Sequence, residues 1–247
     1  MHETIKQEGS LQRVQCLSGS ALKLIALLTM IIDHVGVHLL KNIPACNEVW
    51  FSIPDFDCSI YGISRLIGRI AFPIYCYLIA EGAHYTHSRL LYGRNLLLFA
   101  LISEIPWDLE HEDKVLVLGS QNVFFTLFMG FVCICIYDAW KDKPLYCVPA
   151  LTGAFILMWV LRADYGAAGM ALIFILFLLR EKRIASCLIG SCITSAKWKA
   201  VPGFIIIALY NGKRGFIHGK VMKYLFYAAY PAHIVVIWLL KRTYFGF

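Results

Sequence analysis

Long apolar stretches follow one another along almost the whole chain and are separated by short polar loops. A helix needs about 20 apolar residues to cross about 30 Å of hydrocarbon, because each residue adds about 1.5 Å. The pattern predicts an all-α polytopic bundle of about eight to nine transmembrane spans, in a single integral membrane domain over residues 1–247. The predicted segments are 20–40, 60–83, 88–107, 121–140, 144–162, 166–180, 184–196, 199–211 and 220–241.

Two parts of the chain depart from this pattern. Segments 184–196 and 199–211 are short for a crossing helix, so the region 184–211 is predicted to form a re-entrant or broken pair. Residues 1–19 are polar. We expect them to form a cytoplasmic N-terminal segment.

Composition and charge indicate a membrane protein. Hydrophobic residues make up 59% of the chain and charged residues only 16%, against about 25% charged in soluble domains. The net charge of +7 does not indicate nucleic acid, because the Lys and Arg residues lie in short loops, where they set topology. Basic loops alternate with acidic ones along most of the chain, so the positive-inside rule predicts a cytoplasmic N-terminus.

The nine cysteines show none of the spacings of a metal site, and we expect no metal. Cys46 and Cys58 share a polar loop that the charge pattern places outside the cytoplasm. If the loop lies there, the two thiols can form a disulfide.

The first apolar segment carries ionisable residues at membrane depth. Placing a charged side chain there costs at least about 2.5 to 3.5 kcal/mol, so such residues are taken as functional candidates by default. Lys23 and His34 are close to three helical turns apart, so they share one face about 16 Å apart along the axis. Asp33 points about a quarter turn away from its neighbour. It needs a partner on another helix, and Arg65 or Arg69 is the predicted one.

Arg65 and Arg69 lie one turn apart, before a kink predicted at Pro73. Two guanidinium groups can clamp a phosphate or a carboxylate. The alternative is that they only neutralise Asp33 and Glu81 inside the bundle.

Polar residues also sit near the ends of the third and fourth segments. Glu104 and Asp108 are one turn apart and could share a proton or bind a cationic amine. The alternative, a solvated outer cap beside Glu110 and Glu112, fits Asp108 better than Glu104. Gln121 and Asn122 place two amides at the start of the next segment, and helix capping explains one of them.

The remaining candidates lie in loops and in the last segment. The loop 210–215 places Asn211, Lys213 and Arg214 on the cytoplasmic side, where they suit phosphate, although the positive-inside rule predicts such a loop in any case. Asp164 either serves a cavity or pairs with Arg162. The other candidate cavity residues are Glu81, Tyr165, Tyr227, Tyr230 and His233.

Seven stretches, spread in order over nearly the whole chain, form a recognisable set: LKLIALLTMIIDHVG, IGRIAFPIYCYLIAEG, LISEIPWDL, QNVFFTLFMG, ADYGAAG, YNGKRG and YPAH. In these stretches the chain resembles the TraX family of membrane proteins, whose best-known members acetylate the N-terminal amine of conjugative pilin. The spacing of Lys23 and His34 is also similar to the Arg-x10-His pattern of membrane acyltransferases that use acyl-CoA to modify surface sugars. Lys keeps the charge of Arg but lacks its bidentate fork.

The resemblance implies an acetyltransferase in the bacterial cytoplasmic membrane, surrounded by membrane lipids. Acetyl-CoA would be the donor, and the acceptor would be an amine or hydroxyl at the outer face, on a pilin-like N-terminus or a surface glycan. His34 would act as the base, with Asp33 and Glu104 as further catalytic residues. The phosphates of coenzyme A would be held by Lys23, Arg65, Arg69, Asn211, Lys213 and Arg214.

Two other classes of function stay open. A proton-coupled transporter would use Asp33, His34, Glu81 and Glu104 as a relay, although the chain shows no internal repeat. A non-catalytic membrane scaffold would use the buried charges only to specify packing. The number of such charges argues against the scaffold.

Overall fold

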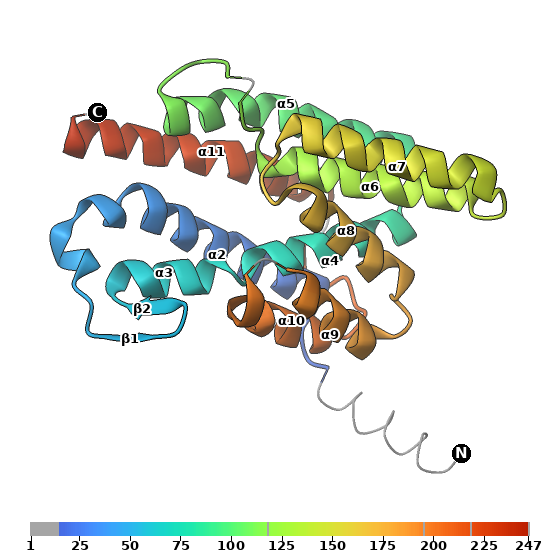
Figure 1. Cartoon of the computed structure of the whole chain (residues 1–247), viewed down its shortest axis with the longest axis horizontal. Helices are drawn as coiled ribbons and strands as arrows, with labels where there is room; N and C mark the ends of the chain where they lie inside the picture. The colour runs from blue at the N-terminus through green and yellow to red at the C-terminus, as the bar shows by residue number, and fades with distance from the viewer. Residues whose placement is uncertain (1–14, 118, 195, 218, 247) are drawn as a thin grey trace, which may run out of the picture.

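Helices dominate the computed structural model, which describes residues 15–117, 119–194, 196–217 and 219–246 (Figure 1). Most of the predicted N-terminal segment 1–19 lies outside the described residues. The elements are α2 (Gly19–His38), η1 (Leu40–Asn42), η2 (Pro44–Asn47), β1 (Phe51–Ile53), β2 (Phe56–Cys58), α3 (Ile60–Gly68), α4 (Ala71–Tyr85), α5 (Arg89–Glu112), α6 (Val123–Trp140), α7 (Pro144–Leu161), α8 (Gly166–Leu178), α9 (Arg183–Ile193), η3 (Lys197–Ala200), α10 (Val201–Ala208) and α11 (Gly219–Phe245).

Each predicted apolar segment coincides with helix, but the number of spans is not confirmed. The stretches long and apolar enough to cross a membrane, within the part of the chain that the structure describes, are Gly19–Asn42, Ile60–Tyr85, Val123–Trp140, Pro144–Leu161 and Gly219–Phe245. The helix α5 has 24 residues but is too polar to join them. The helices α8, α9 and α10 are shorter. The count of eight to nine spans therefore stays a prediction.

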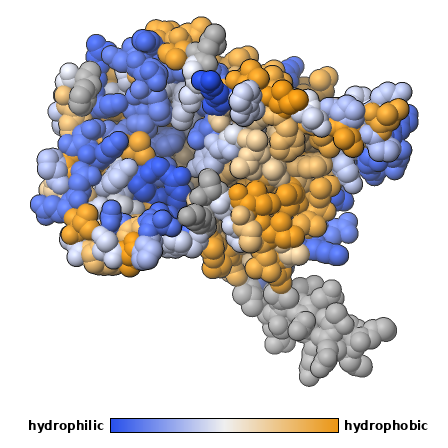
Figure 2. Space-filling model, viewed as in Figure 1, coloured by the Kyte–Doolittle hydropathy of each residue, from blue (hydrophilic) through white to orange (hydrophobic). Residues whose placement is uncertain are grey.

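The surface divides into polar and apolar parts along the long axis of the molecule. Figure 2 shows an extensive hydrophobic surface right of centre, with hydrophilic surface at the left end and at the right tip. On α7, the side chains of Leu145, Val148 and Trp159 are exposed by 79%, 60% and 78%. Soluble proteins rarely expose apolar patches of this kind, whereas lipid covers them at no cost.

The two ends of α2 define the two ends of the bundle used below. The C-terminal ends of α2, α5 and α11 gather with the hairpin β1–β2 at the left of Figure 1, and we call this the His38 end. The N-terminus of α2 lies beside the loop 210–215, because Gly19 N donates to Lys213 O at 2.8 Å and Ser20 N donates to Arg214 O at 2.9 Å. We call this the Gly19 end.

The predicted helix over 60–83 is interrupted before its proline. The helix α3 ends at Gly68 and α4 begins at Ala71, whereas the sequence places the kink at Pro73. A proline ring collides with the carbonyl four residues earlier, which here belongs to Arg69. The break therefore falls at Arg69 and Ile70, and it leaves the Arg69 side chain at a helix end.

Two glycines allow α2 and α3 to approach closely. A Cβ atom on Gly36 would lie 2.1 Å from Ser64 Oγ, and one on Gly68 would lie 2.0 Å from Asp33 Oδ1. Asp33 and Gly36 are three residues apart on α2 and so share one face. This packing brings the Asp33 carboxylate against the helix that carries the predicted arginine partners.

The region 184–211 forms two short helices, α9 with 11 residues and α10 with 8, which pack on each other. This matches the predicted broken or re-entrant pair, and its membrane topology stays a prediction. The sequence allowed a disulfide between Cys46 and Cys58 if their loop lies outside the cytoplasm, and both cysteines are free in the structure. Cys46 lies in η2, whereas Cys58 is buried at the end of β2.

Replacing Gly68 by alanine is expected to destabilise the protein by about 1 to 3 kcal/mol, because the new methyl group overlaps the Asp33 carboxylate. The matched control is Gly153→Ala on α7, where no atom lies within 4 Å of a new Cβ. Helix propensity makes that change neutral or mildly stabilising. Thermal unfolding of the detergent-solubilised variants measures both. Equal melting temperatures for Gly68→Ala and the unmodified protein would contradict the packing.

Candidate functional site

The neighbouring residues Asp33 and His34 serve two different interfaces of α2. Successive residues on a helix point about 100° apart. Asp33 therefore faces α3, where it contacts Arg65, while His34 faces α11, where it contacts His233. The site consists of two polar clusters on either side of the same helix.

The Asp33 cluster confirms the predicted cross-helix pairing. Arg65 Nη1 lies 2.6 Å from Asp33 Oδ2, and Arg69 Nη2 lies 3.5 Å from Asp33 Oδ1. Glu81 does not join this cluster. It accepts a hydrogen bond from Tyr77 Oη at 3.1 Å within α4, three turns beyond Arg69, so the two arginines neutralise Asp33 and not Glu81.

Both arginines also line a cavity at the His38 end of the bundle. The cavity has a volume of about 660 Å³ and lies between α3, the β hairpin and the region before α10. Asp57, Tyr61 and Trp198 line it together with Arg65 and Arg69. The guanidinium groups are 29% and 21% exposed, so they can contact a polar ligand there while they hold Asp33.

The His34 cluster fixes the proton positions on two imidazoles. His233 Nδ1 lies 2.9 Å from Ala229 O, and a carbonyl can only accept, so Nδ1 carries the proton. His233 Nε2 is then the acceptor in its contact of 2.5 Å with His34 Nδ1. His34 consequently donates from Nδ1 and keeps a free lone pair on Nε2. The two rings stack with centroids 4.7 Å apart.

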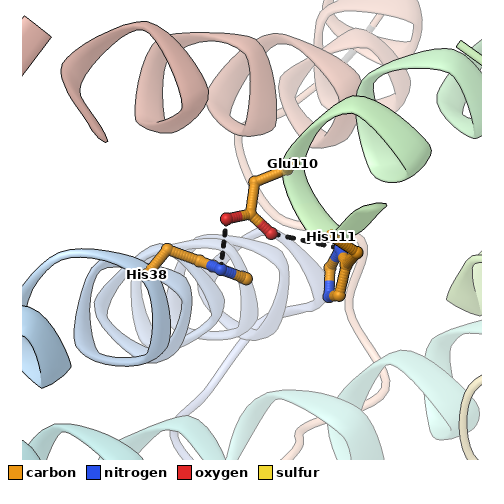
Figure 3. Close-up of side chains that lie close together, drawn as sticks. All are labelled: His38, Glu110 and His111. Carbon is orange, nitrogen blue, oxygen red and sulfur yellow. Dashed lines mark ion pairs between the residues drawn. The ribbon is translucent and has the colours of Figure 1, made fainter. Parts of the chain in front are cut away.

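Next to His34 lies a second group of ligand-type side chains (Figure 3). His38 Nδ1 contacts Glu110 Oε1, and His111 Nδ1 lies 3.1 Å from Glu110 Oε2. Lys241 Nζ lies 3.1 Å from Glu110 Oε1. The ring centroids of His34 and His38 are 5.9 Å apart, so this group continues the His34 cluster towards the end of α2.

Sequence reasoning missed this group and misplaced Glu110. The carboxylate was predicted in a solvated cap, yet Glu110 is only 2% exposed because α2 and α11 cover it. A signal for His38 existed, since it follows His34 by one helical turn and shares its face. Glu110 and Lys241 lie too far along the chain from His38 for any spacing rule to join them.

Glu104 and Asp108 have separate partners. The Asn122 side chain donates to Glu104 Oε2 and, at 2.8 Å, to Ala100 O. Asn122 Oδ1 also accepts from Phe124 N at 3.0 Å and so caps α6. Asp108 Oδ2 accepts from Val117 N at 2.7 Å, and Asp108 is 1% exposed. The predicted solvated cap at Asp108 is therefore wrong, and Glu104 anchors the start of α6.

In the turn between α7 and α8, the Asp164 carboxylate bonds to a backbone amide and not to Arg162. Asp164 Oδ1 accepts from Tyr165 N at 3.0 Å, and within the described residues no ion pair joins Asp164 to Arg162. Burial raises the pKa of Asp164 to about 6, against the opposing effects of the Tyr165 amide and the Arg69 guanidinium. Gln121 holds this turn through its backbone, since Asp164 N donates to Gln121 O at 2.9 Å.

Of the three tyrosine candidates, two pack in the core and the third lies beside the imidazoles of the site. The Tyr165 ring stacks on Phe72 with centroids 3.5 Å apart, and the Tyr227 ring stacks on Phe99 at 5.0 Å. Both therefore serve the core more than a cavity wall. Tyr230 lies beside the imidazoles, with its ring centroid 6.1 Å from that of His34.

The predicted phosphate ligands do not gather in one place. Lys213 and Arg214 lie at the Gly19 end, where their carbonyls accept from the first amides of α2, and Lys23 follows one turn further along that helix. Arg65 and Arg69 lie with Asp33, about 20 Å away along α2. The predicted joint clamp is therefore wrong, because α3 joins α2 near its other end.

The residues that form these contacts fall within the range of one protein family. The family model described as TraX protein matches residues 18–241. The chain belongs to the TraX family. The TraX resemblance carried by the seven stretches is thereby confirmed.

One TraX relative gives a biological setting. A protein of Dichelobacter nodosus, described as probable fimbrial assembly protein FimC, is 24% identical over 249 residues, which cover 89% of this chain and 94% of the relative. No solved structure matches this TraX-family chain.

Asp33→Asn and Arg65→Gln are each expected to destabilise this TraX-family protein, while the double variant loses less than the sum. Asp33→Asn leaves Arg65 without its partner, and Arg65→Gln leaves Asp33 with only the longer contact to Arg69. The Asp33 and Arg65 side chains are 13% and 29% exposed. We expect a coupling energy of about 1 to 3 kcal/mol from a double-mutant cycle of unfolding free energies.

The control pair for this cycle is Arg89 and Asp138, whose side chains are 42% and 22% exposed. Its coupling is expected to stay below about 1 kcal/mol, as for other surface ion pairs. Additive effects at Asp33 and Arg65 would show that their contact does not stabilise the fold.

Proposed function

We propose that this TraX-family protein transfers an acetyl group from acetyl-CoA to an amine or hydroxyl acceptor, with His34 as the general base. The observation that carries the proposal is the orientation of the His34 imidazole by His233. A base needs a free lone pair and a fixed ring, and the contact from Nδ1 to His233 leaves Nε2 available. The resemblance to pilin acetylases supplies the reaction class.

The reaction moves one proton and one acetyl group. The acceptor nitrogen or oxygen attacks the acetyl carbonyl carbon of the thioester, a new bond forms there, and the carbon–sulfur bond breaks. The acceptor proton passes to His34 Nε2 and then to the departing thiolate, which leaves as coenzyme A. The neutral imidazole accepts the proton at Nε2, and the imidazolium that results donates it to the thiolate.

The donor belongs at the Gly19 end under this proposal. Lys23, Lys213 and Arg214 carry positive charge there, and coenzyme A carries phosphates that such charges bind. Lys23 and His34 are about 16 Å apart along one helix, a separation that the flexible pantetheine arm of the donor would bridge. The positive-inside rule puts this end in the cytoplasm of a bacterial cell, where acetyl-CoA is available.

The acceptor belongs at the His38 end. The cavity beside α3 offers Arg65, Arg69 and Tyr61 to a polar group. Since His34 faces the other side of α2, these arginines hold a part of the acceptor remote from the reacting atoms in this proposal. The Dichelobacter relative is described as a probable fimbrial assembly protein, which favours a pilin-like N-terminus over a surface glycan. Asp33 holds the two guanidinium groups in place.

The transporter alternative has less support from the contacts. Its relay would need Glu81 and Glu104 near His34, but within the described residues these carboxylates accept hydrogen bonds from Tyr77 and Asn122. An acetyl-transfer assay tests the scaffold alternative, since a scaffold neither hydrolyses acetyl-CoA nor transfers its acetyl group.

His34→Ala is expected to lower acetyl transfer from radiolabelled acetyl-CoA by about 100-fold or more, the usual contribution of a general base. The assay uses the purified protein, with water, peptides with free N-termini and hexosamines as acceptors. His84→Ala is the matched control, because His84 is exposed at the end of α4. No turnover by the unmodified protein, or equal turnover by His34→Ala, would refute the mechanism.

His233 is a positioning residue in this mechanism, and its variants separate orientation from packing. His233→Ala removes the acceptor of the His34 Nδ1 proton, whereas His233→Gln supplies a carbonyl oxygen that can accept it. We therefore expect kcat to fall in His233→Ala and to recover in part in His233→Gln. Equal losses in both variants would indicate that His233 only packs.

The donor side is tested by the double variant Lys213→Gln and Arg214→Gln. Removing two phosphate ligands is expected to raise the KM for acetyl-CoA while kcat stays similar, because these charges bind the donor equally in ground and transition states. Lys141→Gln, at the exposed end of α6, is the control. An unchanged KM would place the donor elsewhere.

A further inference from the structure

A cluster of metal-ligating groups lies beside the proposed base and is not used by the proposed reaction. His38, Glu110 and His111 each bring one ligand atom to within 4.8 Å of the others. Figure 3 shows the Glu110 carboxylate between the two rings, with His38 on α2 and the other two on α5. The cluster therefore joins two helices at the His38 end.

The hydrogen bond of His111 indicates which of its two ring nitrogens can bind a metal. His111 Nδ1 lies 3.0 Å from Trp107 O, so this nitrogen carries a proton and donates it to the carbonyl. The other nitrogen, Nε2, then keeps its lone pair. Metal-ligating histidines commonly donate their second ring N–H to a backbone carbonyl in this way, which fixes the ring for ligation.

The stacked Trp107 ring restrains His111 further, with centroids 3.8 Å apart. His38 Nδ1 and Glu110 Oε1 are in contact, so a cation could replace the proton between them. A metal ion requires the neutral imidazole and the ionised carboxylate.

The ligand set selects a class of metal. Two imidazoles and one carboxylate form the protein ligands of several catalytic zinc sites. Imidazole suits Zn²⁺ and neighbouring transition metals, whereas Mg²⁺ and Ca²⁺ prefer sites made only of oxygen. Three protein ligands also leave a coordination position open.

The open position would face a cavity. His38, Glu110 and His111 line a pocket of about 620 Å³ together with Asn42 and Trp238. Ions can therefore reach the cluster without crossing the core of the bundle. Glu112 and Asp113 line the pocket together with Lys41 and Arg242, so an entering cation meets side chains of both charges.

Lys241 is the one competitor for the site among the described residues. Its Nζ atom lies 3.1 Å from both Glu110 O and Glu110 Oε1. An ammonium group at a carboxylate occupies the position that a metal ion would take. The Lys241 stem is long and its side chain is 25% exposed, so the ammonium can move into the pocket when a metal binds.

We propose that His38, Glu110 and His111 bind one divalent transition-metal ion of the Zn²⁺ class, in exchange for the Lys241 ammonium. The proposal goes beyond acetyl transfer and does not depend on it. It also replaces the expectation of no metal, which rested on cysteine spacing.

The test measures Zn²⁺ binding by the purified full chain in detergent, without a histidine tag. The protein is stripped with a chelator and dialysed against Zn²⁺, and bound metal is counted by mass spectrometry. One equivalent is expected. His38→Ala and His111→Ala are each expected to weaken binding by 10-fold or more, while His84→Ala binds as the unmodified protein does.

Lys241→Met separates a metal site from an ion-pair network. It removes the competing ammonium and keeps the stem, so tighter Zn²⁺ binding is expected, whereas a purely structural network would gain no metal affinity. Thermal unfolding without metal shows that each variant is folded. The proposal is overturned if the unmodified protein and Lys241→Met both fail to bind Zn²⁺, or if the two histidine variants bind it as well as His84→Ala does.

Discussion

The site depends on the ion pair between Asp33 and Arg65, made across a helix contact that two glycines permit. A carboxylate at membrane depth is stable only beside its counter-charge, and Gly68 lets α3 come close enough to supply it. Once Asp33 is fixed against α3, the geometry of the helix turns His34 towards α11. The neighbouring residues Asp33 and His34 therefore contact two different helices, α3 and α11, and do not contact each other as a pair.

This division gives each end of α2 its own chemistry. The Gly19 end gathers basic residues of the loop 210–215 by backbone hydrogen bonds to the first amides of the helix. The His38 end gathers two arginines, four imidazoles and the buried Glu110. The arginines line one cavity, and His38, Glu110 and His111 line another. A single helix thus links a region of basic residues with the region that holds the imidazoles.

Much of the fold was predictable because hydrophobic length alone marks helices in this class of protein. The sequence also predicted the partner of Asp33, since an isolated acid in an apolar helix demands an arginine nearby. It failed where contacts join distant residues: nothing in the spacing relates His38 to Glu110 or Lys241, and nothing reveals that Asn122 turns back to Glu104. The sequence also led us to group Arg65 with Lys213, because both are basic. Charge alone does not reveal which helices are neighbours in space, and the two residues lie near opposite ends of α2.

The central claim is that His34 acts as a base and does not merely pack or bind the donor. The most direct measurement compares the unmodified protein and His34→Ala for equilibrium binding of radiolabelled acetyl-CoA and for acetyl transfer in the same preparation. The account predicts similar binding and a loss of transfer of about 100-fold or more. Transfer that survives in His34→Ala at the rate of the unmodified protein would contradict it.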